Sequence, residues 1–371
     1  MRPLAPLAIC APNAFKGPLA AAAAAGALAA GAVDAGWRAL PLPVADGGDG
    51  TLDVLLAAAG VKSRTEQVRV TGPLGRPRRA RLGWLGPDVA VVEMAGASGL
   101  RLLGTRREPL RATSRGTGEL MLAALDHGAT RIIVGVGGSA STDGGAGILL
   151  ALGARLLDRH GRSVGLGGGA LSAIAAVDLA TLDPRLGHTA IEVAVDVASP
   201  LCGPAGAAHV FAPQKGADAD QVRILDDGLG HFADLLEEAV DTPGLAGQPG
   251  TGAAGGAGFA LAAIGASLVG GAAMVCDRVG LDEAISGAAL VITGEGRLDA
   301  QTATGKAPWE VAARARRAGV PCVAVCGTVE GGGEDFDAVI ALDRIGREPR
   351  RHVRALLRLA GARAVAARPQ P

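Results

Sequence analysis

The sequence predicts a two-domain α/β fold. Apolar strand-like segments alternate with helical segments at both chain ends, and the middle of the chain breaks this alternation. Near the amino terminus, the apolar run 7–11 precedes the strong helix formers of 19–35. Near the carboxyl terminus, the apolar runs 289–293 and 320–326 enclose a helical segment at 308–318. Short, wholly apolar strands joined by helices are typical of parallel sheets covered on both faces.

The middle of the chain has a different character. Glycines and prolines interrupt residues 68–85, which favours antiparallel hairpins over β-α-β units. The remaining expected strands are 37–44, 89–94, 131–136, 191–197 and 338–342. The remaining helices are 52–59, 118–128 and a segment that follows Gly147 and runs through 156. We therefore expect a Rossmann-like parallel α/β/α domain from residues 1–66 and 281–371, with a mixed α/β domain of residues 67–280 inserted in it.

The composition excludes several classes of protein. The 371 residues include 58 Gly but only five Phe, three Trp and no Tyr, so a stacking surface for single-stranded nucleic acid is not expected. Lys and Arg number 36, as do Asp and Glu, which leaves no net positive charge to attract nucleic acid or an anionic membrane. The apolar fraction of 49% excludes a disordered chain. A small-molecule substrate, with no nucleic-acid or membrane partner, is therefore expected, and a homodimer is one alternative for the assembly.

Five cysteines are spread along the chain without the spacing of a metal site. Buried thiols in a reducing compartment are the simplest interpretation of Cys10, Cys202, Cys276, Cys322 and Cys326. The apolar amino-terminal stretch is interrupted by Pro12, Asn13, Lys16 and Pro18, unlike a secretion signal. We expect a cytoplasmic protein.

A glycine-rich segment, Asp46-Gly-Gly-Asp-Gly-Thr51, connects an expected strand to an expected helix. Its glycines Gly47, Gly48 and Gly50 expose backbone N–H groups, and a helix amino terminus favours an anion. Its two carboxylates are of the kind that hold a divalent cation. The alternative is a tight turn in which Asp46 and Thr51 cap backbone amides.

A second glycine-rich segment spans 137–147 and also connects an expected strand to an expected helix. Gly137 and Gly138 supply backbone donors, Ser139 and Ser141 supply hydroxyl groups, and Asp143 supplies a carboxylate. A dinucleotide-binding fingerprint is disfavoured because a serine stands at its third glycine position. Phosphate or a small polar substrate is the better-supported ligand.

A third segment, Thr293-Gly-Glu-Gly-Arg-Leu-Asp299, is expected as a loop after the strand that ends near residue 293. Gly294 and Gly296 are backbone-donor candidates, and Glu295 is a candidate metal ligand. Lys306 follows as a cation suited to phosphate, although the surrounding residues do not form a P-loop. An ion-paired surface loop is the alternative interpretation.

Four more residues are candidates because of their position. Asn13 and Lys16 follow the first strand, and Asp196 lies in the strand expected at 191–197. Arg115 lies in Thr113-Ser-Arg-Gly-Thr-Gly-Glu119, where its guanidinium is suited to a substrate carboxylate.

Taken together, these segments resemble the bacterial class-I glycerate kinase family. The resemblance extends nearly from end to end, in Ala11-Pro-Asn-Ala-Phe-Lys16, Val44-Ala-Asp-Gly-Gly-Asp-Gly-Thr51, Val70-Thr-Gly-Pro-Leu-Gly75, Thr113–Glu119, Gly137–Gly147, Gly167–Gly169, Leu182–Leu186, Pro213-Gln-Lys-Gly216 and Val291–Asp299. It implies ATP-dependent, Mg²⁺-assisted phosphorylation of D-glycerate, generally at the 2-hydroxyl, in a cleft between two α/β domains.

The resemblance and the residue chemistry together define the expected site. The glycine-rich segments, with Thr51 and Ser141, would bind the phosphates of ATP, while Lys16 and Lys306 neutralise charge. Asn13, Arg115, Ser139 and Asp143 would bind the substrate. Asp46, Asp196 and Glu295 are candidates for the general base or for Mg²⁺ ligands, in an order that the sequence leaves open.

The chain departs from the family pattern at Asn13-Ala14, where the family usually has Asp-Ser. Two alternatives to glycerate phosphorylation therefore stay open. One is another small-molecule kinase, because Gly47-Gly-Asp-Gly-Thr51 also matches the nucleotide-binding segment of NAD kinases and of diacylglycerol-type lipid kinases. The other is a glycerate- or nucleotide-binding regulator without catalytic activity.

Overall fold

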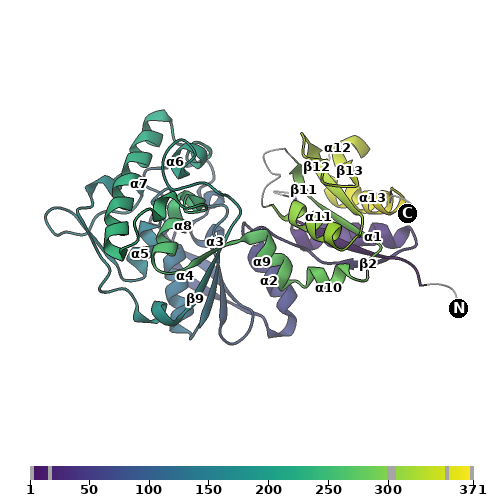
Figure 1. The fold of residues 1–371 in the computed structure, drawn as a ribbon, viewed down its shortest axis with the longest axis horizontal. Coiled ribbons are helices and arrows are strands. Elements are labelled where there is room, and N and C mark those ends of the chain that lie inside the picture. Colours follow the sequence, from purple (N-terminus) through teal and green to yellow (C-terminus); the bar gives the residue numbers. More distant parts are fainter. Residues whose placement is uncertain (1–3, 16–18, 299–305, 347–350, 368–371) are drawn as a thin grey trace. The chain divides into compact units, whose positions relative to one another are not determined.

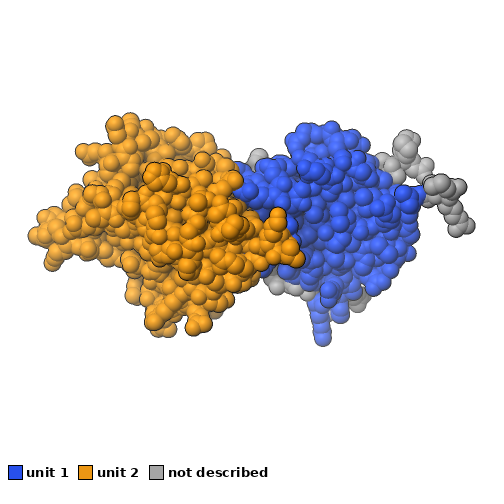
Figure 2. Space-filling view, turned by 90° about the horizontal axis from the view of Figure 1, so that it is seen from below, with its two compact units in different colours: residues 1–46, 53–58, 270–371 blue, residues 47–52, 59–269 orange. Residues whose placement is uncertain are grey.

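The computed structural model describes residues 4–15, 19–298, 306–346 and 351–367, which form two compact units. Unit 1 contains residues 1–46, 53–58 and 270–371, and unit 2 contains residues 47–52 and 59–269 (Figure 2). The expected domain boundaries at 66/67 and 280/281 stay a prediction. Figure 1 shows the fold, with helices and strands labelled where there is room.

Unit 1 is built on a five-stranded parallel sheet in the order β13-β12-β11-β1-β2. Its strands are β1 (Leu7–Pro12), β2 (Arg38–Pro41), β11 (Leu290–Leu298), β12 (Cys322–Val329) and β13 (Ala338–Ala341). Its helices are α1 (Ala21–Asp34), α9 (Gly271–Arg278), α10 (Leu281–Ile285), α11 (Ala307–Arg317), α12 (Leu342–Ile345) and α13 (Val353–Ala366), and α2 (Thr51–Ala59) contains residues of both units.

Both faces of this sheet are buried, as wholly apolar strands require. Along β1, Ala8 and Cys10 pack into a cluster with α1 and α13, whereas Ile9 and Ala11 pack into a second cluster with α9, α10 and α11. Successive side chains of a strand point to opposite faces, so the two clusters cover opposite sides of the sheet. The predicted parallel α/β/α arrangement of the two chain ends is therefore confirmed.

Unit 2 is built on a six-stranded mixed sheet in the order β10-β9-β6-β5-β4-β3. Its β3–β4 and β4–β5 pairs are antiparallel, as predicted for the interrupted segment, while the β5–β6 and β6–β9 pairs are parallel. The strands are β3 (Arg64–Thr71), β4 (Pro77–Trp84), β5 (Val89–Glu93), β6 (Arg131–Gly135), β9 (Ala190–Val195) and β10 (Ser267–Gly270), with a separate two-stranded sheet of β7 (Arg155–Leu157) and β8 (Ala176–Asp178).

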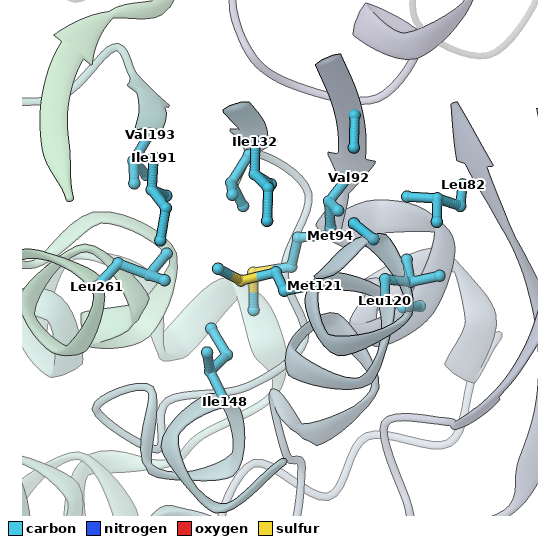
Figure 3. Close-up of a cluster of buried hydrophobic side chains, with 14 of the residues drawn as sticks. Leu82, Val92, Met94, Leu120, Met121, Ile132, Ile148, Ile191, Val193 and Leu261 are labelled. Atoms are coloured by element: carbon cyan, nitrogen blue, oxygen red, sulfur yellow. The ribbon is translucent and has the colours of Figure 1, made fainter. Parts of the chain in front are cut away.

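The helices of unit 2 bury one face of this sheet and form a further core of their own. Val92, Ile132 and Val193 of the sheet face Leu120 and Met121 of α4 (Figure 3). A separate cluster joins α5, α6, α7 and α8. The helices are α3 (Met94–Ser98), α4 (Arg115–Asp126), α5 (Ala146–Ala151), α6 (Ala207–Phe211), α7 (Ala219–Val240) and α8 (Ala253–Ala263).

Two expectations about local structure are wrong. The helix expected through residue 156 ends at Ala151, because the chain turns at Gly153 (φ +105°) into strand β7. The loop expected from Thr293 is instead the second half of β11, which pairs with β12 as far as Leu298. Gly294 and Gly296 are the reason for the wrong expectation, because glycine is unfavourable inside a strand.

Helix α7, with 22 residues, is not among the elements predicted above. Its sequence carries the necessary signals, because Val222, Leu225, Leu229, Phe232 and Leu236 repeat at helical spacing and are buried. A capping box of Asp218 and Gln221 begins it. Among the described residues, no helix has both the length and the apolar character needed to cross a membrane.

Candidate active site

The second glycine-rich segment is organised around Asp143, which is fully buried. One carboxylate oxygen accepts hydrogen bonds from Ser114 N (2.8 Å), Ser114 Oγ (2.9 Å) and Thr113 Oγ1 (3.3 Å), and the other accepts from Gly145 N (3.3 Å). Burial raises the pKa of this carboxyl above its ordinary value, while the hydrogen bonds from Ser114 and Gly145 act in the opposite direction. Asp143 therefore connects segment 137–147 to the beginning of α4.

A buried lysine supports the same segment. Lys215 is only 3% exposed, and its Nζ donates a hydrogen bond to the backbone carbonyl of Ser141. Burial lowers the pKa of Lys215 to about 7, and the nearby charge of Asp143 partly opposes that shift. Lys215 is not among the candidates from the sequence, because a lysine is usually solvated. The signal it did contain is the Pro213-Gln-Lys-Gly216 block of the family resemblance.

The two glycine-rich segments of unit 2 pack against each other backbone to backbone. Gly137 N donates to the carbonyl of Gly47 at 3.1 Å, and a Cβ at Gly137 would lie 2.4 Å from Gly48 Cα. A Cβ at Gly47 would lie 2.8 Å from the Ala194 side chain. Glycine at 47 and 137 is therefore required by close packing over the carboxyl ends of β6 and β9, whatever ligand the segments bind.

The amino terminus of α2 already has an anionic partner from the protein. Gly50 N and Leu52 N donate to Glu93 Oε2 at 3.1 and 3.0 Å. Thr51 is 1% exposed, and its Oγ1 has no hydrogen-bond partner among the described residues. The expected anion site at this helix terminus is thus partly satisfied by a carboxylate, which interacts favourably with the helix dipole.

Candidates from the two chain ends lie together in unit 1. Asn13 Nδ2 donates to Asp46 Oδ2 at 2.9 Å, and Asn13 N donates to the carbonyl of Gly294 at 2.8 Å. Asn13, Asp46 and Glu295 are all nine-tenths or more buried. A Cβ at Gly294 would lie 1.7 Å from the carbonyl oxygen of Val325, so this glycine lets β12 approach β11.

The other candidates lie on several different elements. Arg115 begins α4, and its Nε donates to Glu119 Oε1 at 3.0 Å. Asp196 follows the last residue of β9, and Ser139 forms an isolated β-bridge with Gly99. Lys306 precedes α11 as its N-cap, and Gly296 lies within β11. Lys16 lies outside the described residues.

The three carboxylates suggested for Mg²⁺ are divided between the units: Asp46 and Glu295 belong to unit 1 and Asp196 to unit 2. Within the described ranges, no group of three His, Cys, Asp or Glu side chains is placed to hold a metal ion. Proteins commonly bind Mg²⁺ through one or two carboxylates together with substrate phosphates, so a group of three is not needed. The buried carboxylate Asp46 is suited to that chemistry.

Comparison with known proteins identifies the family. The family model described as the glycerate kinase family matches residues 8–358. The chain belongs to the glycerate kinase family. The family resemblance drawn from the sequence blocks is confirmed, and family membership makes the protein a kinase.

Glycerate kinases of known sequence align over most of this chain. A protein named glycerate kinase from Bacillus subtilis (strain 168) is 49% identical over 326 residues, covering 86% of this chain and 85% of the relative. A protein named glycerate 2-kinase from Escherichia coli (strain K12) is 44% identical over 331 residues, with the same coverage of 86% and 85%.

The fold is also that of a solved family member. A crystal structure assigned as glycerate kinase 2 from Salmonella typhimurium LT2 superposes with a TM-score of 0.83 at 40% sequence identity, covering 98% of each chain. The predicted α/β class of this glycerate kinase family member is confirmed by that similarity.

Burial was expected for all five cysteines and is found for four of them. All five are free thiols; four are buried and Cys202 is partly buried. Burial raises the pKa of Cys10, Cys276 and Cys326 to about 12, so these thiols are neutral and unreactive at neutral pH.

Proposed function

We propose that this kinase transfers the γ-phosphoryl group of ATP to the 2-hydroxyl of D-glycerate, giving 2-phospho-D-glycerate and ADP. The observation that carries the proposal is the 44% identity, over 86% of the chain, to the protein named glycerate 2-kinase. In the reaction the glycerate oxygen forms a bond to phosphorus, the bond from phosphorus to the β–γ bridging oxygen breaks, and the hydroxyl proton passes to a base.

Positioning and charge neutralisation are the main demands of phosphoryl transfer. For unit 2 we propose that segments 47–51 and 137–141 contribute to phosphate binding. The support is that both segments lie at the carboxyl ends of β6 and β9, where open α/β sheets bind ligands. Mg²⁺, bound through carboxylates among Asp46, Asp196 and Glu295, would supply charge neutralisation at the transferring oxygens. Lys16 and Lys306 stay candidates for further neutralisation.

Arg115 is our proposal for the group that binds the glycerate carboxylate. Its side chain is 36% exposed, and Glu119 fixes the orientation of the guanidinium through Nε. Glu119 is itself held by Thr71, whose Oγ1 donates to Glu119 Oε1 at 2.9 Å. A planar guanidinium fixed in this way is suited to bidentate pairing with a carboxylate.

Asp143 is better described as a positioning residue than as a group that touches substrate. It is fully buried, and its carboxylate is occupied by the backbone and hydroxyl donors of residues 113–114 and 145. It accepts a hydrogen bond from the backbone N–H of Ser114, the residue directly before Arg115. A substrate role for Ser139 stays a proposal.

Proton-coupled ³¹P NMR of the product tests activity, acceptor and regiochemistry together. The chain is incubated with ATP, Mg²⁺ and D-glycerate. A phosphate on the 2-hydroxyl couples to one carbon-bound proton and gives a doublet, whereas a phosphate on the 3-hydroxyl couples to two and gives a triplet-like signal. A doublet with stoichiometric ADP supports the proposal, and a triplet-like signal would reassign the position.

The same experiment separates the alternatives. NAD and a short-chain diacylglycerol replace glycerate in parallel samples, and L-glycerate serves as the stereochemical control. Phosphorylation of NAD or diacylglycerol would favour the other kinases that share the Gly47–Thr51 segment. Stabilisation of the chain by glycerate without ADP release would favour the silent regulator that Asn13 suggested.

A further inference from the structure

Unit 2 has a pocket of about 280 Å³ between the β3–β4 hairpin and the 3₁₀ turn Leu100–Leu103. Three arginines line it, namely Arg76, Arg78 and Arg106, and the other described lining residues are glycine, proline and leucine. We call it the arginine pocket. None of the described residues that line it is acidic.

The strand pattern of β4 places Arg78 in this pocket. Arg78 lies on the same face as the buried residues Ala80 and Leu82, whereas Arg79 and Arg81 lie on the opposite, exposed face. Its partner across the hairpin is the buried Val70. On β4 itself, the other residues of this face, Ala80, Leu82 and Trp84, are buried and apolar.

Gly72, which has no side chain, leaves space for the side chain of Arg78. A Cβ at Gly72 would lie 3.5 Å from Arg78 Cδ and 2.8 Å from the carbonyl oxygen of Arg76. Gly72 N donates to that same carbonyl at 2.7 Å, and Gly75 takes the positive φ (+82°) that closes the turn. The hairpin is therefore shaped so that the guanidinium stem packs on the backbone.

The guanidinium of Arg78 has a buried nitrogen without a hydrogen-bond partner among the described residues. Its Nε is inaccessible to solvent and has no hydrogen-bond partner among the described residues. A buried N–H group without an acceptor costs free energy, and the cost is higher for a charged group. Arg106 differs, because its Nε is already paired with Glu108. Because Nε is closed to solvent, an anion in the pocket would pair with the terminal nitrogens of Arg78, for which the described residues supply no acceptor either.

We propose that the arginine pocket binds the phosphate group of a small organic phosphate, paired to Arg78 and Arg76. A dianion with three acceptor oxygens can accept from two guanidinium groups at once, which a monocarboxylate does less well. The walls formed by Pro73, Leu102 and Leu103 lower the local polarity and strengthen such a pairing. This inference goes beyond the proposed phosphoryl transfer and does not depend on it.

Calorimetric titration of the full chain with 3-phospho-D-glycerate tests the proposal. The chain is first saturated with Mg²⁺ and a non-hydrolysable ATP analogue, so that nucleotide-phosphate sites are filled. We expect binding that weakens at least about tenfold in Arg78→Gln. Arg79→Gln, on the opposite face of the same strand, is the matched control and should change the affinity less than about twofold.

A second variant and a second ligand complete the experiment. Arg76→Gln changes an exposed side chain and therefore leaves the fold intact. This variant should also bind 3-phospho-D-glycerate more weakly than the natural chain does. The test therefore stays valid if Arg78→Gln misfolds. D-Glycerate is titrated separately, and its affinity should be the same in Arg78→Gln and in the natural chain. This binding can be measured even if the chain phosphorylates no acceptor, so failure of the proposed function is seen separately.

Three outcomes would overturn the proposal. One is no measurable binding of 3-phospho-D-glycerate by the natural chain. Another is an equal loss of affinity for 3-phospho-D-glycerate in Arg78→Gln and Arg79→Gln, which would indicate a general charge effect. The third is an equal loss of D-glycerate affinity in Arg78→Gln, which would make the arginine pocket part of the glycerate site.

Discussion

At the residue scale, Asp143 and Lys215 are two charged side chains buried in one neighbourhood of unit 2. Lys215 holds the Ser141 carbonyl, and Asp143 holds the amide and hydroxyl of Ser114. Removing one member of such a pair leaves the other charge buried without compensation, which is strongly destabilising. The two residues therefore fix the position of segment 137–147 relative to α4.

The first prediction concerns the pH dependence caused by Lys215. The pKa of Lys215 is about 7 in the folded chain, against an ordinary value of 10.5 for a solvated lysine, so between these values the unfolded state binds more protons. The free energy of unfolding contributed by this group therefore rises as the pH increases through that window. From pH 7 to pH 9, the natural chain should gain about 2 kcal/mol relative to Lys215→Met.

Urea denaturation of both proteins at the two pH values measures this difference. Buried thiols with raised pKa values act in the opposite direction above pH 8, but they are common to both proteins and cancel in the comparison. Parallel stability profiles for the two proteins would show that Lys215 does not titrate in this window.

The second prediction follows from the proposed role of Arg115. Lysine keeps the positive charge but loses the planar fork, so Arg115→Lys should raise the KM for D-glycerate at least about tenfold. The KM for ATP should change less than about twofold, because the proposed contact is to the acceptor. Steady-state kinetics with each substrate varied in turn provides both values.

Arg111→Lys is the control for the Arg115 variant, since Arg111 is 70% exposed and pairs only with Glu108 among the described contacts. Its KM values should match those of the natural chain. An unchanged KM for D-glycerate in Arg115→Lys would remove Arg115 from the substrate site.

At the scale of the elements, glycines decide how closely helices and strands approach. Helices α1 and α13 pack with their backbones nearly in contact: a Cβ at Gly361 would lie 2.2 Å from the carbonyl oxygen of Leu28, and a Cβ at Gly31 would lie 1.8 Å from that of Arg358. Gly26, on the same α1, has open space around it. The two kinds of helical glycine are indistinguishable in sequence.

The third prediction uses this contrast. Gly361→Ala should lower the free energy of unfolding by about 1–3 kcal/mol, because the backbones of α1 and α13 must separate. Gly26→Ala, the matched control, should raise it by about 0.5–1 kcal/mol through better helix propensity. Chemical denaturation of the two variants measures both values, and a stabilised Gly361→Ala would contradict the close packing.

The glycine-rich segments 47–50 and 137–147 show how local pattern and tertiary context combine. Their sequence indicated a place where backbone N–H groups meet an anion, and part of that expectation is met internally by Glu93 on Gly50 and Leu52. Other glycines in the segments serve backbone packing. A glycine run alone does not distinguish a ligand from a neighbouring strand, because both need the same bare backbone.

At the scale of the whole molecule, unit 1 is assembled from both chain ends, whereas unit 2 has cores of its own. Strand β1 lies between β2 and β11, and α13 contributes to the same apolar cluster as α1. The members of that cluster from α13 are Val353, Leu356, Leu357, Ala360, Ala364 and Val365. The clusters of unit 2 contain residues from within 68–268.

The fourth prediction is that a chain ending after residue 351 loses unit 1 and retains unit 2. In the full chain, α13 covers the apolar side chains of Leu28 and Ile292, and this burial stabilises unit 1. Without α13 that burial is lost. Hydrogen exchange followed by mass spectrometry should show lost protection in β1 and β11 and native protection in β6 and β9. A chain ending after residue 367 keeps α13 and is the control. Full protection of β1 in the shorter chain would contradict the prediction.

The order of residues is enough to predict the α/β class, the parallel sheet of the chain ends, the antiparallel β3–β4 hairpin and, through its motifs, the glycerate kinase family. These follow from local periodicity and from ordered residue blocks, which are properties of the chain read in order. The folded chain is needed to show that Asp143 and Lys215 are buried together, that Glu93 accepts from the α2 amides and that Arg78 lines a pocket. Each of these depends on contacts between residues far apart in sequence, and burial, which sets their charge state and hydrogen bonding, is not encoded at any one position.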